Sequence, residues 1–309
     1  MKMKTARIHA FGDVSVIRID EVPLPRPAPG DVLVRVAATS FNPTEAALRA
    51  GLLQAFLPVT LPFALGWDVA GTVVEVGPGT ARWAVGDRVV GRLDGAGAAA
   101  EYVAAPGAVL VPAPVSVPLT HAAALPLAGL TAWQAVFEHG RVAAGRRVLV
   151  NGAGGGTGGF VTQLAKHAGA EVIATASARS TGAVRRHGAD QVIDYTAAPV
   201  ASALDRPVDT LLNLVPLSPQ DAAALVPTVR PGGRIVSIAT PVEPPAGAGV
   251  TATHMIARNE LAHLAALVEL VDTGTITLDI SASHPLADLA EVHRLGEAGR
   301  IRGKVLVIP

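Results

Sequence analysis

Val150-Asn151-Gly152-Ala153-Gly154-Gly155-Gly156-Thr157-Gly158-Gly159 joins a short apolar run, Arg147–Asn151, to a helix-forming segment, Gly158–His167. The turn fits the pattern G-x-G-x-x-G, with Ala153 in place of the first glycine. Such a turn lets a pyrophosphate approach the backbone without meeting a Cβ, and the N–H groups at the helix start face the phosphates. A flexible turn without a ligand is the alternative. The position between a strand and a helix favours a dinucleotide site.

The segments after this turn alternate between apolar strand patterns and helical patterns. Strands are predicted at Glu171–Thr175, Gln191–Ile193, Asp209–Val215 and Gly233–Ile238, and helices at Ser180–His187 and Pro219–Val229. Strands that read as unbroken apolar runs are typical of a parallel sheet covered on both faces. The pattern therefore predicts an α/β fold with a doubly wound parallel sheet.

The first third of the chain reads as β-rich. Short strands bounded by Gly/Pro turns are predicted at Val32–Val36, Gly71–Val76, Arg88–Gly91 and Glu101–Val103. This spacing favours a small barrel or a strongly bent sheet. The turn Phe41-Asn42-Pro43-Thr44 leads into a predicted helix at Glu45–Ala50, and a longer helix is predicted through Ala122–Glu138, ending at Gly140.

The last part of the chain lies beyond the alternating units. Helices are predicted around His254–Asp272 and Leu286–Glu297, followed by a strand at Lys304–Ile308 that we expect to rejoin the first domain. The predicted domains are residues 1–118, completed by 256–309, and residues 119–255.

Composition excludes several classes of protein. Half of the 309 residues are apolar, 16% are charged and the formal net charge is zero, which favours a folded protein without a nucleic-acid or membrane partner. There is no cysteine, so disulfides and thiolate chemistry are excluded. The start of the chain lacks the apolar core of a signal peptide, so we expect a cytoplasmic protein. Abundant alanine, with arginine preferred to lysine, suggests a GC-rich bacterial source.

The end of the second strand of the array indicates which dinucleotide binds. No carboxylate occurs between Glu171 and Asp190, where an NAD enzyme usually carries one for the ribose hydroxyls. Ser177 and Arg179 stand there instead and could hold a 2′-phosphate, which favours NADPH. The alternative for Arg179 is a solvated place in the first turn of the next helix. Arg185 and Arg186 are weaker candidates.

Several landmarks, taken in order along the whole chain, carry a family resemblance. They are Ser40-Phe41-Asn42-Pro43, Leu65-Gly66-Trp67-Asp68-Val69-Ala70-Gly71, Val85-Gly86-Asp87-Arg88-Val89, Ala100-Glu101-Tyr102-Val103, Gly129-Leu130-Thr131-Ala132-Trp133, the turn at Asn151–Gly159, Gly188-Ala189-Asp190-Gln191-Val192-Ile193-Asp194-Tyr195, Pro231-Gly232-Gly233-Arg234 and Gly303-Lys304-Val305. Together they resemble the medium-chain dehydrogenase/reductase superfamily, in its zinc-free quinone oxidoreductase (zeta-crystallin-like) branch.

The resemblance implies a GroES-like domain for substrate and catalysis, a Rossmann domain for the cofactor and, in many members, a homodimer. It implies that Asn42 and Thr131 line the nicotinamide side and that Tyr195 lies near the adenosine ribose and its 2′-phosphate. The strand ends Asn213–Val215 and Ser237–Ala239 would border the cofactor. The complete predicted cofactor set is Asn42, Thr131, Ala153, Gly155, Gly156, Thr157, Gly158, Ser177, Arg179, Tyr195, Asn213, Val215, Ser237, Ile238 and Ala239.

Two departures from the family pattern matter. Zinc-dependent relatives use a cysteine ligand and a Gly-His-Glu segment, whereas this chain has Gly66-Trp67-Asp68 and no cysteine, so no metal is predicted. Zeta-crystallin-like members carry a tyrosine near the substrate, but this chain has Ala46-Ala47, which indicates a roomier pocket. Phe41, Phe63 and Trp67 are candidates for an apolar wall of the substrate cleft, and core packing is the alternative for each.

The predicted activity is an NADPH-dependent transfer of hydride to a quinone or an α,β-unsaturated carbonyl. Hydride transfer needs orientation, exclusion of water and stabilisation of charge on the acceptor oxygen. Asn42 is the candidate catalytic residue, as a positioning group or oxyanion donor; the alternative is that this Asn before Pro only holds a turn. An enoyl-thioester reductase, or a protein that binds NADPH without turnover, are the alternatives. The expected partner is a small electrophile.

Overall fold

The computed structural model describes residues 1–309, which divide into two compact units. Unit 1 contains Met1–Leu127, Asn259–Gly274 and Ile280–Pro309, and unit 2 contains Ala128–Arg258 and Thr275–Asp279. These bounds differ from the predicted ones of 118/119 and 255/256. Helix α2 (Leu119–Ala122) packs on strands of unit 1. Thr277 returns to unit 2 because its N–H donates to the Gln163 side chain at 2.8 Å.

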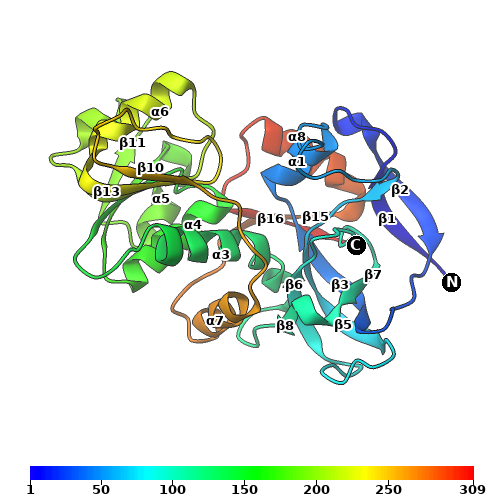
Figure 1. Ribbon diagram of the computed structural model, residues 1–309. Coiled ribbons are helices and arrows are strands. Elements are labelled where there is room, and N and C mark those ends of the chain that lie inside the picture. The colour runs from blue at the N-terminus through cyan, green and yellow to red at the C-terminus, as the bar shows by residue number, and fades with distance from the viewer. The chain divides into compact units, whose positions relative to one another are not determined.

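Unit 2 is a six-stranded sheet in which every pairing is parallel. The strand order is β11 (Gln191–Asp194), β10 (Glu171–Ala176), β9 (Arg147–Asn151), β12 (Val208–Asn213), β13 (Val229–Ser237) and β14 (Thr251–His254). The chain winds outward in one direction from β9 and then in the other from β12, which is the doubly wound order predicted. Helices α4 (Gly156–His167), α5 (Ala178–Arg186) and α6 (Pro219–Leu225) connect β9 to β10, β10 to β11 and β12 to β13 (Figure 1).

Unit 1 contains two sheets. One has the order β15 (Ile280–Pro285), β16 (Lys304–Ile308), β3 (Asp31–Ser40), β5 (Asp68–Val76), β6 (Arg88–Arg92) and β8 (Leu110–Pro112), with β7 (Tyr102–Pro106) also paired to β3. The other is β2 (Ile17–Pro23), β1 (Lys2–Ile8) and β4 (Phe63–Ala64). Strand β16 pairs antiparallel with β3, placing Leu306 beside Ser40. The prediction that the last strand rejoins the first domain is therefore confirmed.

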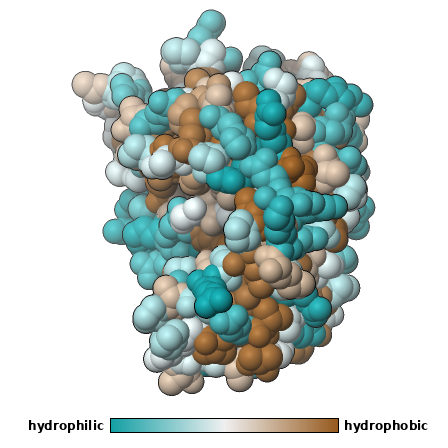
Figure 2. All heavy atoms as spheres, turned by 90° about the vertical axis from the view of Figure 1, so that its right-hand side faces the viewer, coloured by the Kyte–Doolittle hydropathy of each residue, from teal (hydrophilic) through white to brown (hydrophobic).

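Helix α1 (Pro43–Arg49) lies beside α8 (Leu289–Glu297) in unit 1 (Figure 1). Their facing residues belong to an apolar cluster that includes Ile8, Leu48, Val292 and Val305. Figure 2 looks onto the side of unit 1 and shows a broad hydrophilic band with apolar residues gathered below it. None of the helices of the protein combines the length and apolar character needed to span a bilayer.

Two predicted helices differ most from the structure. The helix predicted at Ala122–Glu138 is divided into α2, α3 (Pro126–Trp133) and a wider π-helical segment (Gln134–His139), because Pro126 has no N–H to continue a helix from α2. The helix predicted from His254 was wrong in its first part. His254 ends the edge strand β14, and helix α7 runs over Leu261–Asp272. The protein also contains short 3-10 helices at Val14–Val16, Gly107–Val109, Val200–Ala203, Val226–Thr228 and Leu286–Asp288.

Candidate functional site

The glycine turn of unit 2 uses its glycines for different physical reasons. Gly152 has φ +96°, a conformation that L side chains rarely adopt. A Cβ on Gly158 would lie 2.3 Å from the Gly152 carbonyl oxygen, so this glycine allows helix α4 to approach the turn closely. A Cβ on Gly155 would meet nothing nearer than the Gly152 oxygen at 3.7 Å. Gly155 is therefore exposed on an open side, where a ligand can approach the backbone.

Helix α4 begins at Gly156, two positions earlier than predicted. Its N-cap, Gly155, supplies no side-chain hydrogen bond. The N–H groups of Gly156, Thr157 and Gly158 belong to the first turn, which has no preceding helical carbonyl to accept from them. These donors, with the positive end of the helix dipole, form a binding site for an anion such as a pyrophosphate.

Buried polar side chains link the carboxyl ends of four strands of the parallel sheet. Asn151 Nδ2 donates to Asn213 Oδ1 at 2.9 Å, and Asn213 Nδ2 donates to Ser237 Oγ at 3.1 Å. Thr175 Oγ1 donates to Asn151 Oδ1 at 2.9 Å and accepts the Gly152 N–H at 2.8 Å. The network therefore holds the glycine turn against the strand ends. Asn213 and Ser237 were predicted at this edge. Thr175 was not, although a polar residue ending a buried strand is the signal that could have found it.

The carboxyl end of β10 carries the two residues predicted to read the 2′-phosphate. Ser177 is the N-cap of α5, its side chain makes no capping bond, and Arg179 is exposed in the first turn. Sequence reasoning missed a carboxylate beside them, because strand pairing places Asp194 of β11 next to Ala176. Asp194 accepts the N–H and hydroxyl of Thr196 at 2.9 and 2.6 Å, and these bonds lower the pKa of its carboxyl. Asp194 is therefore an ionised carboxylate beside the carboxyl end of β10.

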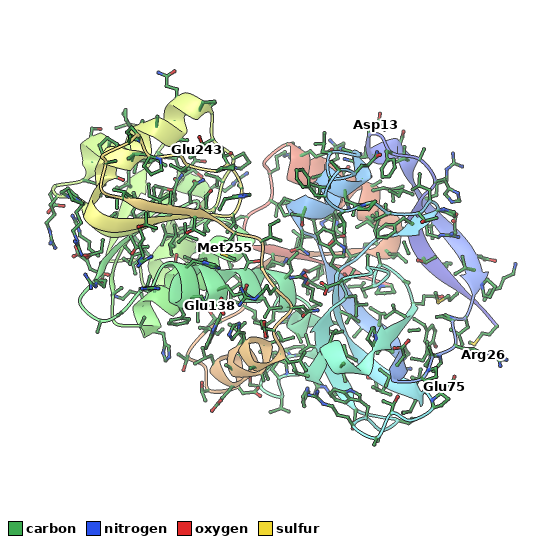
Figure 3. The ribbon with its side chains drawn as sticks, in the orientation of Figure 1. Asp13, Arg26, Glu75, Glu138, Glu243 and Met255 are labelled. Atoms are coloured by element: carbon green, nitrogen blue, oxygen red, sulfur yellow. The ribbon has the colours of Figure 1, made fainter.

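Of the remaining predicted cofactor residues of unit 2, Ala153 in the glycine turn is buried, and the others are half-buried or exposed. Ile238 and Ala239 follow β13, Val215 follows β12, and Thr131 lies on α3. Tyr195, in the turn after β11, is 55% exposed. Met255, labelled in Figure 3, donates its N–H to the Ser237 carbonyl at 2.9 Å and closes the end of β13. Val215, Tyr195, Ile238 and Ala239 therefore follow the carboxyl ends of their strands, the edge at which a doubly wound sheet binds its ligand.

Unit 1 contains a buried polar cluster around Asn42, the residue before helix α1. Asn42 Nδ2 donates to Asp68 Oδ2 at 2.9 Å, to Glu45 Oε1 at 3.2 Å and to the Ser40 carbonyl at 3.2 Å. Lys304 Nζ donates to Asn42 Oδ1 at 2.8 Å. Every polar atom of the Asn42 side chain thus has a partner, and Asn42 is 5% exposed.

The two carboxylates of this cluster differ in how strongly they are stabilised. Asp68 accepts the Ser40 hydroxyl at 2.5 Å and the Leu127 N–H at 2.8 Å, and it lies 3.7 Å from Lys304 Nζ. Besides the Asn42 amide, Glu45 accepts the Gly66 N–H at 3.2 Å. Burial raises the pKa of Glu45 to about 7, with a further contribution from the negative charge of Asp68. Burial also lowers the pKa of Lys304, and the negative charges of Asp68 and Glu45 counteract part of this shift.

The cluster does not fit a metal ion. A catalytic zinc needs several His, Cys or carboxylate ligands and an open position. No group of three or more His, Cys, Asp or Glu side chains in the protein is placed to hold a metal. The oxygens of Asp68 and Glu45 already accept hydrogen bonds from Ser40, Asn42, Gly66 and Leu127, and the ammonium of Lys304 is the cation beside them.

The three candidates for an apolar cleft wall all belong to a hydrophobic cluster of unit 1. Phe41 is 5% exposed, and its ring meets His293 edge-on with centroids 5.0 Å apart, so it is a core residue. Phe63 and Trp67 are half-buried and pack on the same cluster. In helix α1, Ala46 is buried and Ala47 half-buried.

Comparisons with known proteins agree with both parts of this description. Residues 28–115 match the alcohol dehydrogenase GroES-like domain family, and residues 187–307 match the family described as zinc-binding dehydrogenase. The chain is 33% identical to the chloroplast envelope quinone oxidoreductase homolog of Arabidopsis thaliana, over 94% of this chain and 93% of that protein. The chain belongs to the medium-chain dehydrogenase/reductase superfamily, in its zinc-independent quinone oxidoreductase branch.

Other members of the superfamily extend the likeness. The chain is 30% identical to the chloroplastic NADPH-dependent alkenal/one oxidoreductase of Arabidopsis thaliana, over 100% of this chain and 80% of that protein. The quinone oxidoreductase structure from Coxiella burnetii superposes with a TM-score of 0.91 at 30% identity, with full coverage of both chains. The Escherichia coli quinone oxidoreductase complexed with NADPH gives 0.89 at 25% identity, covering 99% of this chain and 100% of the other. The zinc in one family description is not matched by the donor residues of this member.

Proposed function

We propose that the protein is an NADPH-dependent oxidoreductase that reduces quinones or α,β-unsaturated carbonyl compounds without a metal. The observation that carries the proposal is the glycine turn of unit 2, with unpaired helix donors beside it and with Ser177 and Arg179, in place of a carboxylate, directly after β10. Relatives named as quinone oxidoreductases and as an NADPH-dependent alkenal/one oxidoreductase support both acceptor classes.

Different residues of unit 2 bind different parts of NADPH. The N–H groups of Gly156, Thr157 and Gly158 bind the pyrophosphate, while Ser177 and Arg179 bind the 2′-phosphate. Tyr195 flanks the adenosine ribose, and Thr131 with the turns after β12 and β13 borders the rest. Bound in this way, the cofactor supplies a hydride, and the protein supplies orientation and exclusion of water.

Unit 1 supplies the acceptor side of the reaction. The Asn42 amide has both of its N–H groups engaged, so we propose a positioning role for Asn42 at the nicotinamide side. Backbone N–H groups then stabilise the developing oxyanion, and the proton comes from solvent. Phe63 and Trp67, which are half-buried, contribute apolar surface to the acceptor site.

The activity is tested by following NADPH oxidation spectrophotometrically with benzoquinone, with a small alkenal and with crotonyl thioester as separate acceptors. We expect turnover with the first two. Turnover with the thioester alone would assign the protein to enoyl-thioester reduction. Tight NADPH binding without turnover of any acceptor would leave a binding protein and refute the proposal.

The cofactor assignment is tested by Arg179→Ala, with Arg26→Ala, at an exposed arginine of unit 1, as the control. Loss of a charge-assisted contact to a phosphate should raise the dissociation constant for NADPH roughly tenfold or more and leave that for NADH nearly unchanged. Arg26→Ala should change neither dissociation constant. Equal losses for the two cofactors in Arg179→Ala would contradict a 2′-phosphate site.

We further propose a cytoplasmic, bacterial protein that works as a homodimer, as the composition and the family resemblance suggest. Sedimentation equilibrium of the purified protein measures the oligomeric state. A monomer at micromolar concentrations with full reductase activity would remove the dimer from the proposal.

A further inference from the structure

Lys304 is a buried cation that lies beside the turn containing Asn42, although it is far from Asn42 in the sequence. Its side chain is 4% exposed. The pairing of β16 with β3, and the bond from the Phe41 N–H to the Val305 carbonyl at 3.0 Å, place it beside this turn. Its ammonium donates to the Phe41 carbonyl at 3.0 Å and to Asn42 Oδ1 at 2.8 Å.

These neighbours allow the Asn42 amide a single orientation. An ammonium can only donate hydrogen bonds, and an ionised carboxylate can only accept them. In the observed arrangement, Oδ1 faces Lys304 and Nδ2 faces Asp68. A flipped amide would turn its NH₂ group towards the ammonium and its carbonyl towards the carboxylate, so it would lose both bonds and meet like charge twice.

The partners of the amide are themselves fixed. Asp68 is tied to the Ser40 hydroxyl and to the Leu127 N–H, and Glu45 to the Gly66 N–H. A buried ion pair is seldom more stable than well-packed apolar residues of similar size, and fixing one arrangement among several is its best-attested use. An apolar side chain at position 304 would fill the strand without desolvating a charge. We therefore attribute to the Lys304 ammonium the orientation of the Asn42 side-chain amide.

We infer that Lys304 is a positioning residue for the proposed reduction: with Asp68, it holds the Asn42 side-chain amide in one orientation and thereby fixes the turn that carries it. The inference rests on the proposed function, which sets Asn42 at the nicotinamide side. Lys304 acts through Asn42 and touches neither cofactor nor acceptor.

A double-mutant cycle tests the inference. Lys304→Met, Asn42→Ala and the double variant are compared with the unmodified protein by kcat/KM for benzoquinone at saturating NADPH. Misplacing a group that orients the reacting atoms should lower kcat/KM by roughly 10- to 100-fold in each single variant. If Lys304 works through Asn42, the double variant should be no slower than Asn42→Ala alone. The inference would be overturned if the loss of kcat/KM in the double variant equalled the product of the two single losses. It would also be overturned if Lys304→Met left kcat/KM unchanged.

Two further variants separate positioning from loss of stability. Val307→Ala removes buried apolar atoms from the same strand and should lower the unfolding midpoint while leaving kcat/KM unchanged. Lys304→Gln keeps an N–H donor without the charge and should retain more activity than Lys304→Met. If Lys304→Met does not fold, the cycle is run with Lys304→Gln.

The orientation of Asn42 also has a readout that does not depend on turnover. The Nδ2 protons of Asn42, assigned in NMR spectra by their loss in Asn42→Ala, should exchange slowly with solvent in the unmodified protein and faster in Lys304→Met. That change in a protein that reduces no acceptor would keep the positioning role and remove the proposed function. Reduction of acceptors, with the Asn42 exchange rates of Lys304→Met unchanged, would keep the function and remove the positioning role.

Discussion

The Glu45→Gln substitution removes a buried carboxyl whose proton affinity the fold raises. Glu45 is 3% exposed and shares its surroundings with Asp68, so burial and a like charge raise its pKa from 4.5 to about 7. The folded protein therefore binds this proton more tightly than the unfolded chain does. The contribution of Glu45 to the free energy of unfolding is fully present below pH 4.5 and is lost as the pH rises to about 7.

The size of the loss follows from the two pKa values. Each pH unit between 4.5 and about 7 is worth about 1.4 kcal/mol, so the protein should lose about 3 kcal/mol across this range. Gln cannot ionise and lacks this dependence. Its NH₂ group must face either the Asn42 amide or the Gly66 N–H, which adds a destabilisation that does not vary with pH.

Urea unfolding at a series of pH values measures the effect. The unfolding free energy of the unmodified protein minus that of Glu45→Gln should fall by about 3 kcal/mol between pH 4 and pH 8. Glu21→Gln, at a carboxylate that is 65% exposed, is the control and should give parallel curves. Parallel curves for Glu45→Gln as well would refute the argument that Glu45 holds its proton in the folded state.

Three other predictions follow from buried or close-packed positions. His293 is fully buried, both of its ring nitrogens lack partners, and burial, with the charge of Arg49, lowers its pKa to about 3. The folded protein thus favours neutral His293, and this contribution to the free energy of unfolding is lost as the pH falls below 6.5. In urea unfolding, His293→Leu should gain nearly 3 kcal/mol relative to the unmodified protein when the pH is lowered to about 4.5. Equal losses of stability in acid for the two proteins would contradict this. Gly158→Ala places a Cβ 2.3 Å from a carbonyl oxygen, so its free energy of unfolding should fall by about 1–3 kcal/mol in the same assay. An unfolding midpoint equal to that of the unmodified protein would show that the turn can move to accommodate the methyl group. Gly155→Ala has open space and should keep its midpoint while its NADPH affinity, measured by fluorescence titration, drops at least about tenfold; unchanged affinity would place the phosphates elsewhere.

The parallel sheet of unit 2 was predictable because of how it is buried. Strands covered on both faces read as apolar runs, and the glycine turn at Asn151–Gly159 marks the first crossover. Strand β14 was missed because its residues, Thr251–His254, are half-buried or exposed at the sheet edge and show no apolar run. Pro126 was visible in the sequence, but its effect of dividing one helix from the next depends on how the segment packs.

The site in unit 1 was only partly predictable. Asn42 could be named because a family motif surrounds it, whereas the partners that fix its amide could not. Lys304 stands 262 positions away in the sequence and reaches Asn42 through the pairing of β16 with β3. Glu45 was expected only as part of a helix, because a charged residue in the first turn of a helix normally faces water. Contacts between distant segments leave no local pattern to read.

The place of β16 at the end of the chain also has a consequence for synthesis. Domains generally fold as units while the ribosome is still adding residues, the earlier one first. Here residues 128–258 of the second unit emerge while the first unit still lacks its last two strands, β15 and β16. Until then, the Thr39–Ser40 end of β3 and the apolar surface that Val305 and Val307 will cover stay open. We therefore expect the unit that begins the chain to be the last to fold, and to need protection from aggregation in the meantime.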